Sequence, residues 1–142
     1  MFRFLLVLST FILSSYATLI YAVDSSSAVS KDDYASTLGM GYSRAIIRGY
    51  DSACDVGGRV NQNFVSSYKH ARAAGYTDIQ TYWLPCNGEG YNCKTYDMQV
   101  RDLSETIASN QMDIEMIWVD FEQDSDCKNN VSVHFTTTNS IR

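Results

Sequence analysis

Residues 116–122, Met-Ile-Trp-Val-Asp-Phe-Glu, join an apolar run to a pair of carboxylates. The run from Met116 to Val119 is typical of a strand buried in a parallel sheet, and two acidic residues arrive where it ends. Side chains alternate between the two faces of a strand, so this stretch has an acidic face with Trp118, Asp120 and Glu122 and an apolar face with Ile117, Val119 and Phe121. We expect the apolar face to pack against helices and the acidic face to line an open site.

The chain before this stretch alternates between two periodicities. Short runs rich in branched or aromatic residues predict strands at residues 19–24, 44–50 and 78–84. Apolar residues at helical spacing predict helices at residues 34–38, 61–74 and 96–110. Ser30 is expected to cap the first helix and Gly75 to end the second. The predicted order is therefore βαβαβαβ.

This alternation is typical of a parallel sheet with helices packed outside it, either an open doubly wound sheet or a (β/α)8 barrel. No glycine-rich phosphate loop follows the first strand, which reads Val-Asp-Ser-Ser-Ser-Ala-Val-Ser, and this weakens the nucleotide-binding version of the open sheet. Each predicted strand ends in polar residues, as the strands of barrel enzymes do. The expected fold is α/β of the (β/α)8 TIM-barrel type, with only its first four βα-like units present.

The strand ends are expected to bring three carboxylates together, because Asp24 ends the first strand on the same face as Asp120 and Glu122. Neighbouring carboxylates cannot all ionise cheaply, so one becomes a general acid beside an ionised partner. Glycoside cleavage uses this chemistry, and the spacing does not decide between retention and inversion. Alone, the Asp-x-Glu pattern is weak, and an acidic surface loop extended by Asp124 and Asp126 is the alternative.

Three other residues at strand ends are candidates for substrate binding. Arg48 is expected to bind an anionic substrate group or, alternatively, to pair with Asp24 or Asp120. Tyr82 is a candidate for stacking on a sugar, although aromatic residues in strands more often belong to the core. Tyr50 lies at the end of the second predicted strand and completes this predicted set.

The first 17 residues predict a secretory signal, with Arg3 before an apolar segment and small residues at its end. A signal anchor is the alternative, because apolar residues resume at Leu19. Four cysteines remain after cleavage, and in an oxidising compartment they predict two disulfides with three possible pairings. A short glycine-containing loop separates Cys86 from Cys93 and favours a disulfide between these two. Cys54 is then left to pair with Cys127. The spacing of cysteines and histidines fits no zinc site, so no metal is expected.

Four segments in order resemble the family 25 glycoside hydrolases, the CH-type lysozymes, in their cysteine-containing eukaryotic branch. They are Tyr-Ala-Val-Asp-Ser-Ser-Ser at residues 21–27, Ala-Ile-Ile-Arg-Gly-Tyr at 45–50, His-Ala-Arg-Ala-Ala-Gly-Tyr at 70–76 with the strand after it, and Met-Ile-Trp-Val-Asp-Phe-Glu at 116–122. The resemblance implies that Asp24, Asp120 and Glu122 are catalytic, with Glu122 as general acid. Asp120 would stabilise the cationic centre or orient the acetamido group. The implied substrate is bacterial peptidoglycan, cut at the β-1,4 bond after N-acetylmuramic acid, and no cofactor is implied.

The resemblance stops after the Asp-x-Glu strand, where such a barrel would continue for about as many residues again. We therefore expect a signal peptide at residues 1–17, a partial barrel domain at 18–127 and a polar tail at 128–142 with a glycosylation sequon at Asn130. The expected function is a secreted lysozyme acting outside the cell or in a lysosomal or phagosomal lumen, in antibacterial defence or digestion. The alternatives are a catalytically inactive carbohydrate-binding fragment and a truncated product without function.

Composition narrows the remaining classes of function. The chain has 142 residues, 45% of them apolar, which suits one globular domain. Its net charge is −5 and it has no cluster of lysines and arginines, which argues against nucleic-acid binding. No stable membrane insertion is expected once the signal has been cleaved.

Overall fold

A computed structural model describes residues 19–88 and 91–121 of the chain. The described part is an α/β structure in which strands and helices alternate along most of its length. The elements in order are β1 (Ala22–Ser25), α1 (Lys31–Gly39), β2 (Arg44–Asp51), β3 (Arg59–Val60), α2 (Phe64–Ala74), β4 (Asp78–Trp83), α3 (Tyr96–Ser109) and β5 (Ile117–Val119).

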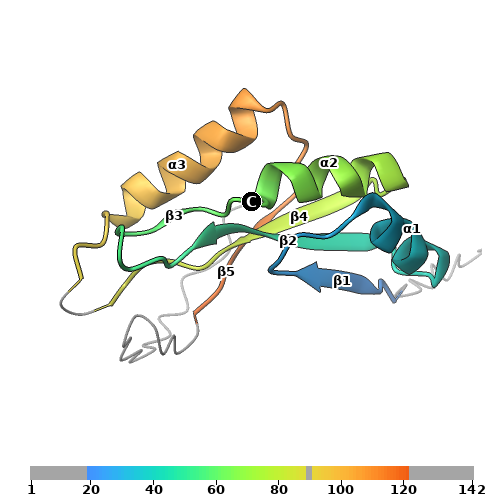
Figure 1. Ribbon diagram of the computed structural model, residues 1–142, viewed down its shortest axis with the longest axis horizontal. Helices are drawn as coiled ribbons and strands as arrows, with labels where there is room; N and C mark the ends of the chain where they lie inside the picture. Colours follow the sequence, from blue (N-terminus) through green and yellow to red (C-terminus); the bar gives the residue numbers. More distant parts are fainter. Residues whose placement is uncertain (1–18, 89–90, 122–142) are drawn as a thin grey trace, which may run out of the picture.

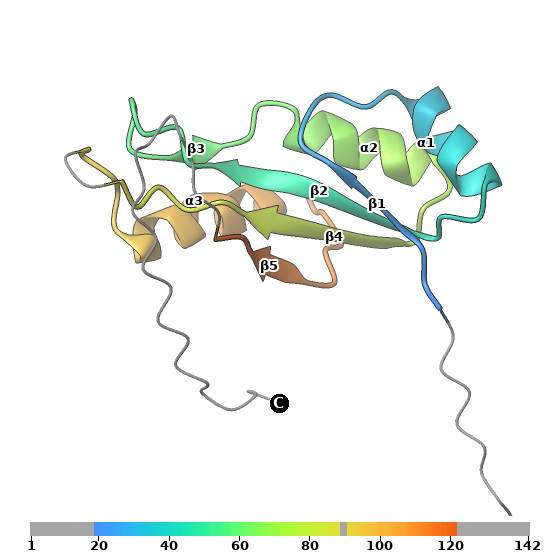
Figure 2. The same ribbon diagram turned by 90° about the horizontal axis from the view of Figure 1, so that it is seen from below.

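Four of the strands form a parallel sheet in the order β1-β2-β4-β5, which is also their order along the chain. Figure 2 shows these four strands side by side, with β3 beyond the end of β2. A helix connects each parallel strand to the next, as a parallel crossover requires. The predicted α/β class with a mostly parallel sheet is confirmed.

The predicted helix signals correspond to observed contacts. Ser30 caps α1 in a capping box, because its Oγ accepts a hydrogen bond from the Asp33 backbone N–H while the Asp33 carboxylate accepts from the Ser30 N–H. Gly75 ends α2 in the left-handed conformation with φ of 109°, which glycine adopts without a steric penalty. These two signals position the helices over the sheet.

One face of the sheet forms the core with all three helices. Ala45, Ile47 and Ile79 point from β2 and β4 toward these helices and are buried. The helices contribute the buried side chains Tyr34, Phe64, Tyr68, Ala71 and Leu103 to the same cluster. Figure 1 shows α2 and α3 on the same side of the sheet. The alternate residues of these strands point to the opposite face of the sheet, where the candidate site lies.

The short strand β3 was not predicted. Its two residues pair antiparallel with the end of β2, Val60 with Tyr50 and Arg59 with Asp51. Two residues are too few to show a hydrophobic alternation, so no pattern in the sequence marked them.

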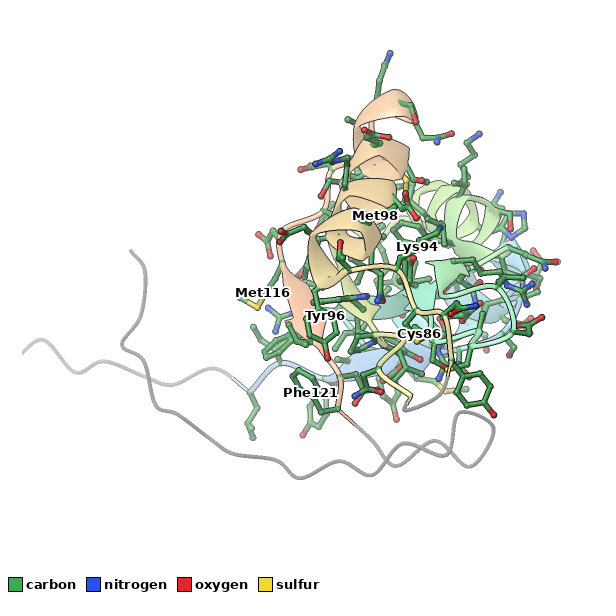
Figure 3. The ribbon with its side chains drawn as sticks, turned by 90° about the vertical axis from the view of Figure 1, so that its left-hand side faces the viewer. Cys86, Lys94, Tyr96, Met98, Met116 and Phe121 are labelled. Atoms are coloured by element: carbon green, nitrogen blue, oxygen red, sulfur yellow. A yellow bond between two sulfur atoms is a disulfide. The ribbon has the colours of Figure 1, made fainter. Side chains whose placement is uncertain are left out.

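The expectation that the apolar face of the last strand packs against helices is wrong for the described residues. The side chains of Ile117, Val119 and Phe121 are 41%, 50% and 54% exposed. Figure 3 shows Met116 at one end of β5 and Phe121 past the other end, with Tyr96 and Met98 on α3. The apolar pattern was correct, but no described helix covers this face of β5.

The N-terminal alternative of a membrane anchor concerns residues 1–18, which lie outside the described part. Among the described residues, none of the helices combines the length and apolar character needed to span a bilayer.

Candidate active site at the strand ends

Asp24 lies near the end of β1 and faces away from the helices. Its neighbour Ser25 contacts α1, where the Ser25 and Tyr34 hydroxyl groups lie 3.1 Å apart. Because successive side chains point to opposite faces, Asp24 is directed to the other side of the sheet. The prediction that Asp24 points away from the helix layer therefore agrees with the neighbouring contacts.

Arg48 and Tyr82 are neighbours on this same face. They are paired in the register between β2 and β4, and Arg48 Nε donates a hydrogen bond to the Tyr82 hydroxyl at 2.8 Å. The Arg48 guanidinium also lies 5.2 Å from the centroid of the Tyr82 ring. Arg48 Nη1 is 3.9 Å from Asp51 Oδ1, which is ion-pair distance but too long for a hydrogen bond.

The last strand adds Trp118 and Asp120 to this face. Trp118 pairs in register with Tyr82, and its indole N–H donates to Gln80 Oε1 at 2.7 Å. The Asp120 backbone N–H donates to the Trp83 carbonyl at 3.0 Å, which continues the pairing beyond the end of β5. These two contacts fix the direction of the chain as it enters the Asp-x-Glu segment.

Four of these residues, Asp24, Tyr82, Trp118 and Asp120, help to line an open cavity of about 340 Å³ toward the carboxyl ends of the parallel strands. Its lining residues are Asp24, Ile46, Tyr82, Trp118, Val119 and Asp120. The structure thus brings the predicted catalytic residues Asp24 and Asp120 to one site, with the predicted sugar-stacking residue Tyr82 between them.

The cavity changes the ionisation of two of its groups. Burial raises the pKa of Asp24, Arg48 opposes this increase, and the nearby Asp120 charge adds to it. Burial also raises the pKa of Tyr82, and the hydrogen bond from Arg48 opposes that increase. The site therefore favours a carboxyl group that keeps its proton to higher pH than an ordinary aspartate.

Among the predicted site residues that the structure describes, Arg48 and Tyr50 do not line this cavity. Tyr50 is fully buried on the opposite side, where its hydroxyl donates to Asp102 of α3 at 3.4 Å. Burial, followed by the Asp102 charge, raises the pKa of Tyr50. Glu122 follows the last described residue, so its predicted position in the site lies outside the described part.

The predicted disulfide between Cys86 and Cys93 is present, with their Cα atoms 5.5 Å apart. Cys54 is also disulfide-bonded, and its Sγ lies 3.4 Å from that of Cys86. The predicted partner of Cys54, Cys127, lies outside the described residues, as does the sequon residue Asn130. These three sulfurs are close enough to hold a metal ion, but their disulfide bonds remove the thiolates that would bind it.

Sequence reasoning missed Gln99, which fixes the chain beyond β4. Its side chain is completely buried in α3 and accepts hydrogen bonds from the Cys86 N–H at 2.9 Å and the Trp83 indole N–H at 3.3 Å. Its amide group donates to the carbonyl oxygens of Cys86 and Lys94 at 2.9 and 2.8 Å. Gln99 lies one helical turn before the buried Leu103, so a polar residue on the apolar face of the helix was the available signal.

The fold and the cavity define the class of protein: an α/β protein whose acidic site lies at the carboxyl ends of parallel strands. A family model described as lysozyme-like protein 1 matches residues 15–142. The chain belongs to the family of GH25-type lysozymes.

Curated relatives support this assignment. The chain is 33% identical over 121 residues to the probable GH family 25 lysozyme 4 of Dictyostelium discoideum, covering 84% of this chain and 53% of the relative. It is 31% identical over 100 residues to the probable GH family 25 lysozyme 5 of the same organism, a match that covers 70% of this chain and 43% of the relative. Lysozyme-like protein 5 of Caenorhabditis elegans is 31% identical over 101 residues, a match that covers 71% of this chain and 44% of the relative. The chain spans about half the length of these relatives, and no solved structure matches it.

Proposed function

We propose that this chain carries the acid-bearing part of a secreted lysozyme that hydrolyses the β-1,4 bond between N-acetylmuramic acid and N-acetylglucosamine in bacterial peptidoglycan. The observation that carries the proposal is the shared cavity of Asp24 and Asp120, which come from the first and last parallel strands. Membership of the lysozyme family supports the glycosidase chemistry. Antibacterial defence or digestion is the corresponding biological role.

In the proposed mechanism, Glu122 donates a proton to the leaving oxygen as the general acid. The carboxylate of Asp120 stabilises the positive charge that develops on the sugar, or it orients the acetamido group. Asp24 completes the acidic site, and the raised pKa of its carboxyl group limits the number of negative charges held there. Tyr82 and Trp118 supply the apolar surface on which a sugar ring stacks.

We further propose that the four parallel strands are the first four of a (β/α)8 barrel. Their order in the sheet follows their order in the chain, whereas a doubly wound sheet reverses its order at a switch point. A parallel strand normally has both faces covered, so the exposed side chains of β5 support the presence of further elements beside it in the complete fold.

Secretion is supported by the disulfide chemistry as well as by the predicted signal at residues 1–17. The Cys86–Cys93 bridge and the bonded state of Cys54 fit an oxidising compartment such as the extracellular space or a lysosomal or phagosomal lumen.

The alternative is a catalytically inactive fragment that binds carbohydrate. The open form of the cavity favours it, because no described element covers the cavity above Trp118 and Asp120. Such a fragment would bind cell walls without cutting them.

Lysis of bacterial cell walls, followed by loss of turbidity, tests the proposal. Glu122→Gln keeps the shape of the side chain but removes the transferable proton, so lysis should fall by at least about 100-fold while binding to sedimented walls is retained. Asp120→Asn should also reduce lysis, because it removes the fixed negative charge.

Glu115→Gln is the matched control, since it makes the same chemical change at an exposed residue that precedes β5 and does not line the cavity. Equal lysis by the parent and by Glu122→Gln would show that the Asp-x-Glu segment is not catalytic. Wall binding without lysis by the parent chain would favour the inactive fragment.

A further inference from the structure

The cavity is rich in hydrogen-bond acceptors and poor in available donors. The carboxylate oxygens of Asp24 and Asp120 accept hydrogen bonds, and the other lining residues Ile46 and Val119 have apolar side chains, which offer no donor. The indole N–H of Trp118 is a donor, but it is already engaged by Gln80 at 2.7 Å. Among the lining side chains that the structure describes, Tyr82 therefore has a hydroxyl donor open to a ligand.

The contact with Arg48 determines what the Tyr82 hydroxyl can do. A phenolic hydroxyl has one proton to donate and lone pairs to accept with, whereas a guanidinium group only donates. Arg48 Nε donates to the Tyr82 oxygen at 2.8 Å, so the phenolic proton must point elsewhere. In the described part of the chain, no side chain or carbonyl receives that proton.

We propose that Arg48 is a positioning residue, which holds the acceptor side of the Tyr82 hydroxyl and thereby presents its proton to an oxygen atom of the bound sugar. This inference rests on the proposed function, since it assigns the ligand to the same cavity. The ligand class is a neutral saccharide, because it must offer hydroxyl or amide donors to the two carboxylates and an acceptor oxygen to Tyr82.

The placement of Arg48 suits this role. It is paired with Tyr82 across β2 and β4, so the backbone ladder sets the distance between their side chains. The Arg48 side chain is 26% exposed, and burial of this extent restricts the positions that a long side chain can take. Arg48 is not among the residues that line the cavity, so its effect on a ligand should pass through Tyr82.

A different role for Arg48 would be to balance the charge of the carboxylates, since it also opposes the increase in the pKa of Asp24. The two roles predict different couplings between residues. A positioning role requires Tyr82 to be present, whereas charge balance acts on Asp24 with or without the Tyr82 hydroxyl.

A double-mutant cycle with Arg48→Met and Tyr82→Phe separates them. The probe is the β-1,4 tetramer of N-acetylglucosamine, and its dissociation constant is measured by calorimetry on the whole chain. Each single substitution should weaken binding by about 3- to 10-fold, the range for one net hydrogen bond. In the Tyr82→Phe background, Arg48→Met should then increase the dissociation constant by less than about 2-fold.

Arg44→Met is the control. Arg44 is an arginine on the same strand and face, but it pairs with Asp78 at the other end of β2 and should leave the affinity unchanged. An equal loss from Arg48→Met in both backgrounds would overturn the positioning role in favour of charge balance.

A second measurement needs no ligand. Carbon-13 labelled tyrosines are titrated by NMR, and Tyr82 is identified by the signal missing in Tyr82→Phe. Arg48→Met should raise the pKa of Tyr82, because Arg48 opposes its increase, while Arg44→Met should not. An unchanged pKa of Tyr82 in Arg48→Met would overturn the inference. A parent chain that binds no tetramer would instead overturn the proposed function, and the titration alone would then judge the Arg48–Tyr82 contact.

Discussion

Replacing Gly49 with alanine should destabilise the sheet at the point where it positions Arg48. Gly49 lies in β2 beside an irregularity in the pairing with β4, between Arg48 and Tyr50. A Cβ atom at this position would overlap Thr81 Oγ1 and lie 2.8 Å from Leu103 Cδ1, closer than real Cβ contacts come. The sheet and α3 would have to separate locally to make room.

The size of the effect follows from two contributions. Inserting a methyl group into a filled core costs about 1–3 kcal/mol. The displaced Thr81 hydroxyl also loses its buried hydrogen bond to the Ile47 carbonyl, 2.7 Å long, which adds about 1 kcal/mol. We therefore expect the unfolding free energy to fall by about 2–4 kcal/mol and the Tm by roughly 10 °C or more for a domain of this size.

Thermal and urea denaturation followed by circular dichroism would measure this loss. Gly39→Ala is the matched control, because no atom lies within 4 Å of the new Cβ at the end of α1. Alanine favours a helix over glycine, so this control should be neutral or stabilising by up to about 1 kcal/mol. If Gly49→Ala lost less than about 0.5 kcal/mol, the close packing of β2 against Thr81 and Leu103 would be refuted.

Two further predictions concern stability. Gln99→Leu should lower the unfolding free energy by about 3 kcal/mol or more, because it leaves the Cys86 N–H and the carbonyl groups of Cys86 and Lys94 without their hydrogen bonds. Chemical denaturation would measure this loss, with Gln62→Leu at an exposed position as the control. Asp24→Asn should stabilise the fold at neutral pH, because the folded-state pKa of Asp24 is raised above 3.8 and its ionisation therefore opposes folding. This advantage should shrink as the pH falls through the folded pKa and vanish below about 3.8; a stability difference that does not change from pH 3 to pH 7 would contradict it.

Local signals predicted the elements of this fold well. The capping residue Ser30 and the glycine after α2 act through contacts within a few residues, and both are observed as expected. The alternation of apolar residues in β5 was also read correctly, since Trp118 shares a face with Gln80 and Tyr82. What the pattern could not show was whether a neighbouring element covers Ile117 and Val119, because coverage depends on distant parts of the fold.

The site was harder to predict where residue type and position did not decide the direction of a side chain. Tyr50 and Tyr82 are both tyrosines near strand ends, yet Tyr50 is buried against α3 and Tyr82 lines the cavity. The pairing irregularity between Arg48 and Tyr50 changes the alternation at the end of β2, so counting residues along the strand fails there. Gln99 shows the converse case, in which a polar residue in the core has a structural task.

Residues from the two outer strands of the parallel sheet form one site, and curvature of the sheet would account for this. β2 and β4 separate β1 from β5, and three strand spacings of about 4.8 Å would hold Asp24 and Asp120 roughly 14 Å apart on a flat sheet. The two carboxylates nevertheless line one cavity, and the charge of Asp120 contributes to the raised pKa of Asp24. A concave face opposite the helices, as in a sheet that bends toward closure, would bring the two carboxylates closer than a flat sheet does. Pairs of catalytic carboxyl groups in glycosidases lie about 5–9.5 Å apart, a separation that a curved sheet can provide from distant strands and a flat one cannot. Under the proposed function, the helices packed on the other face would serve the chemistry by holding a bend that brings these two acids together.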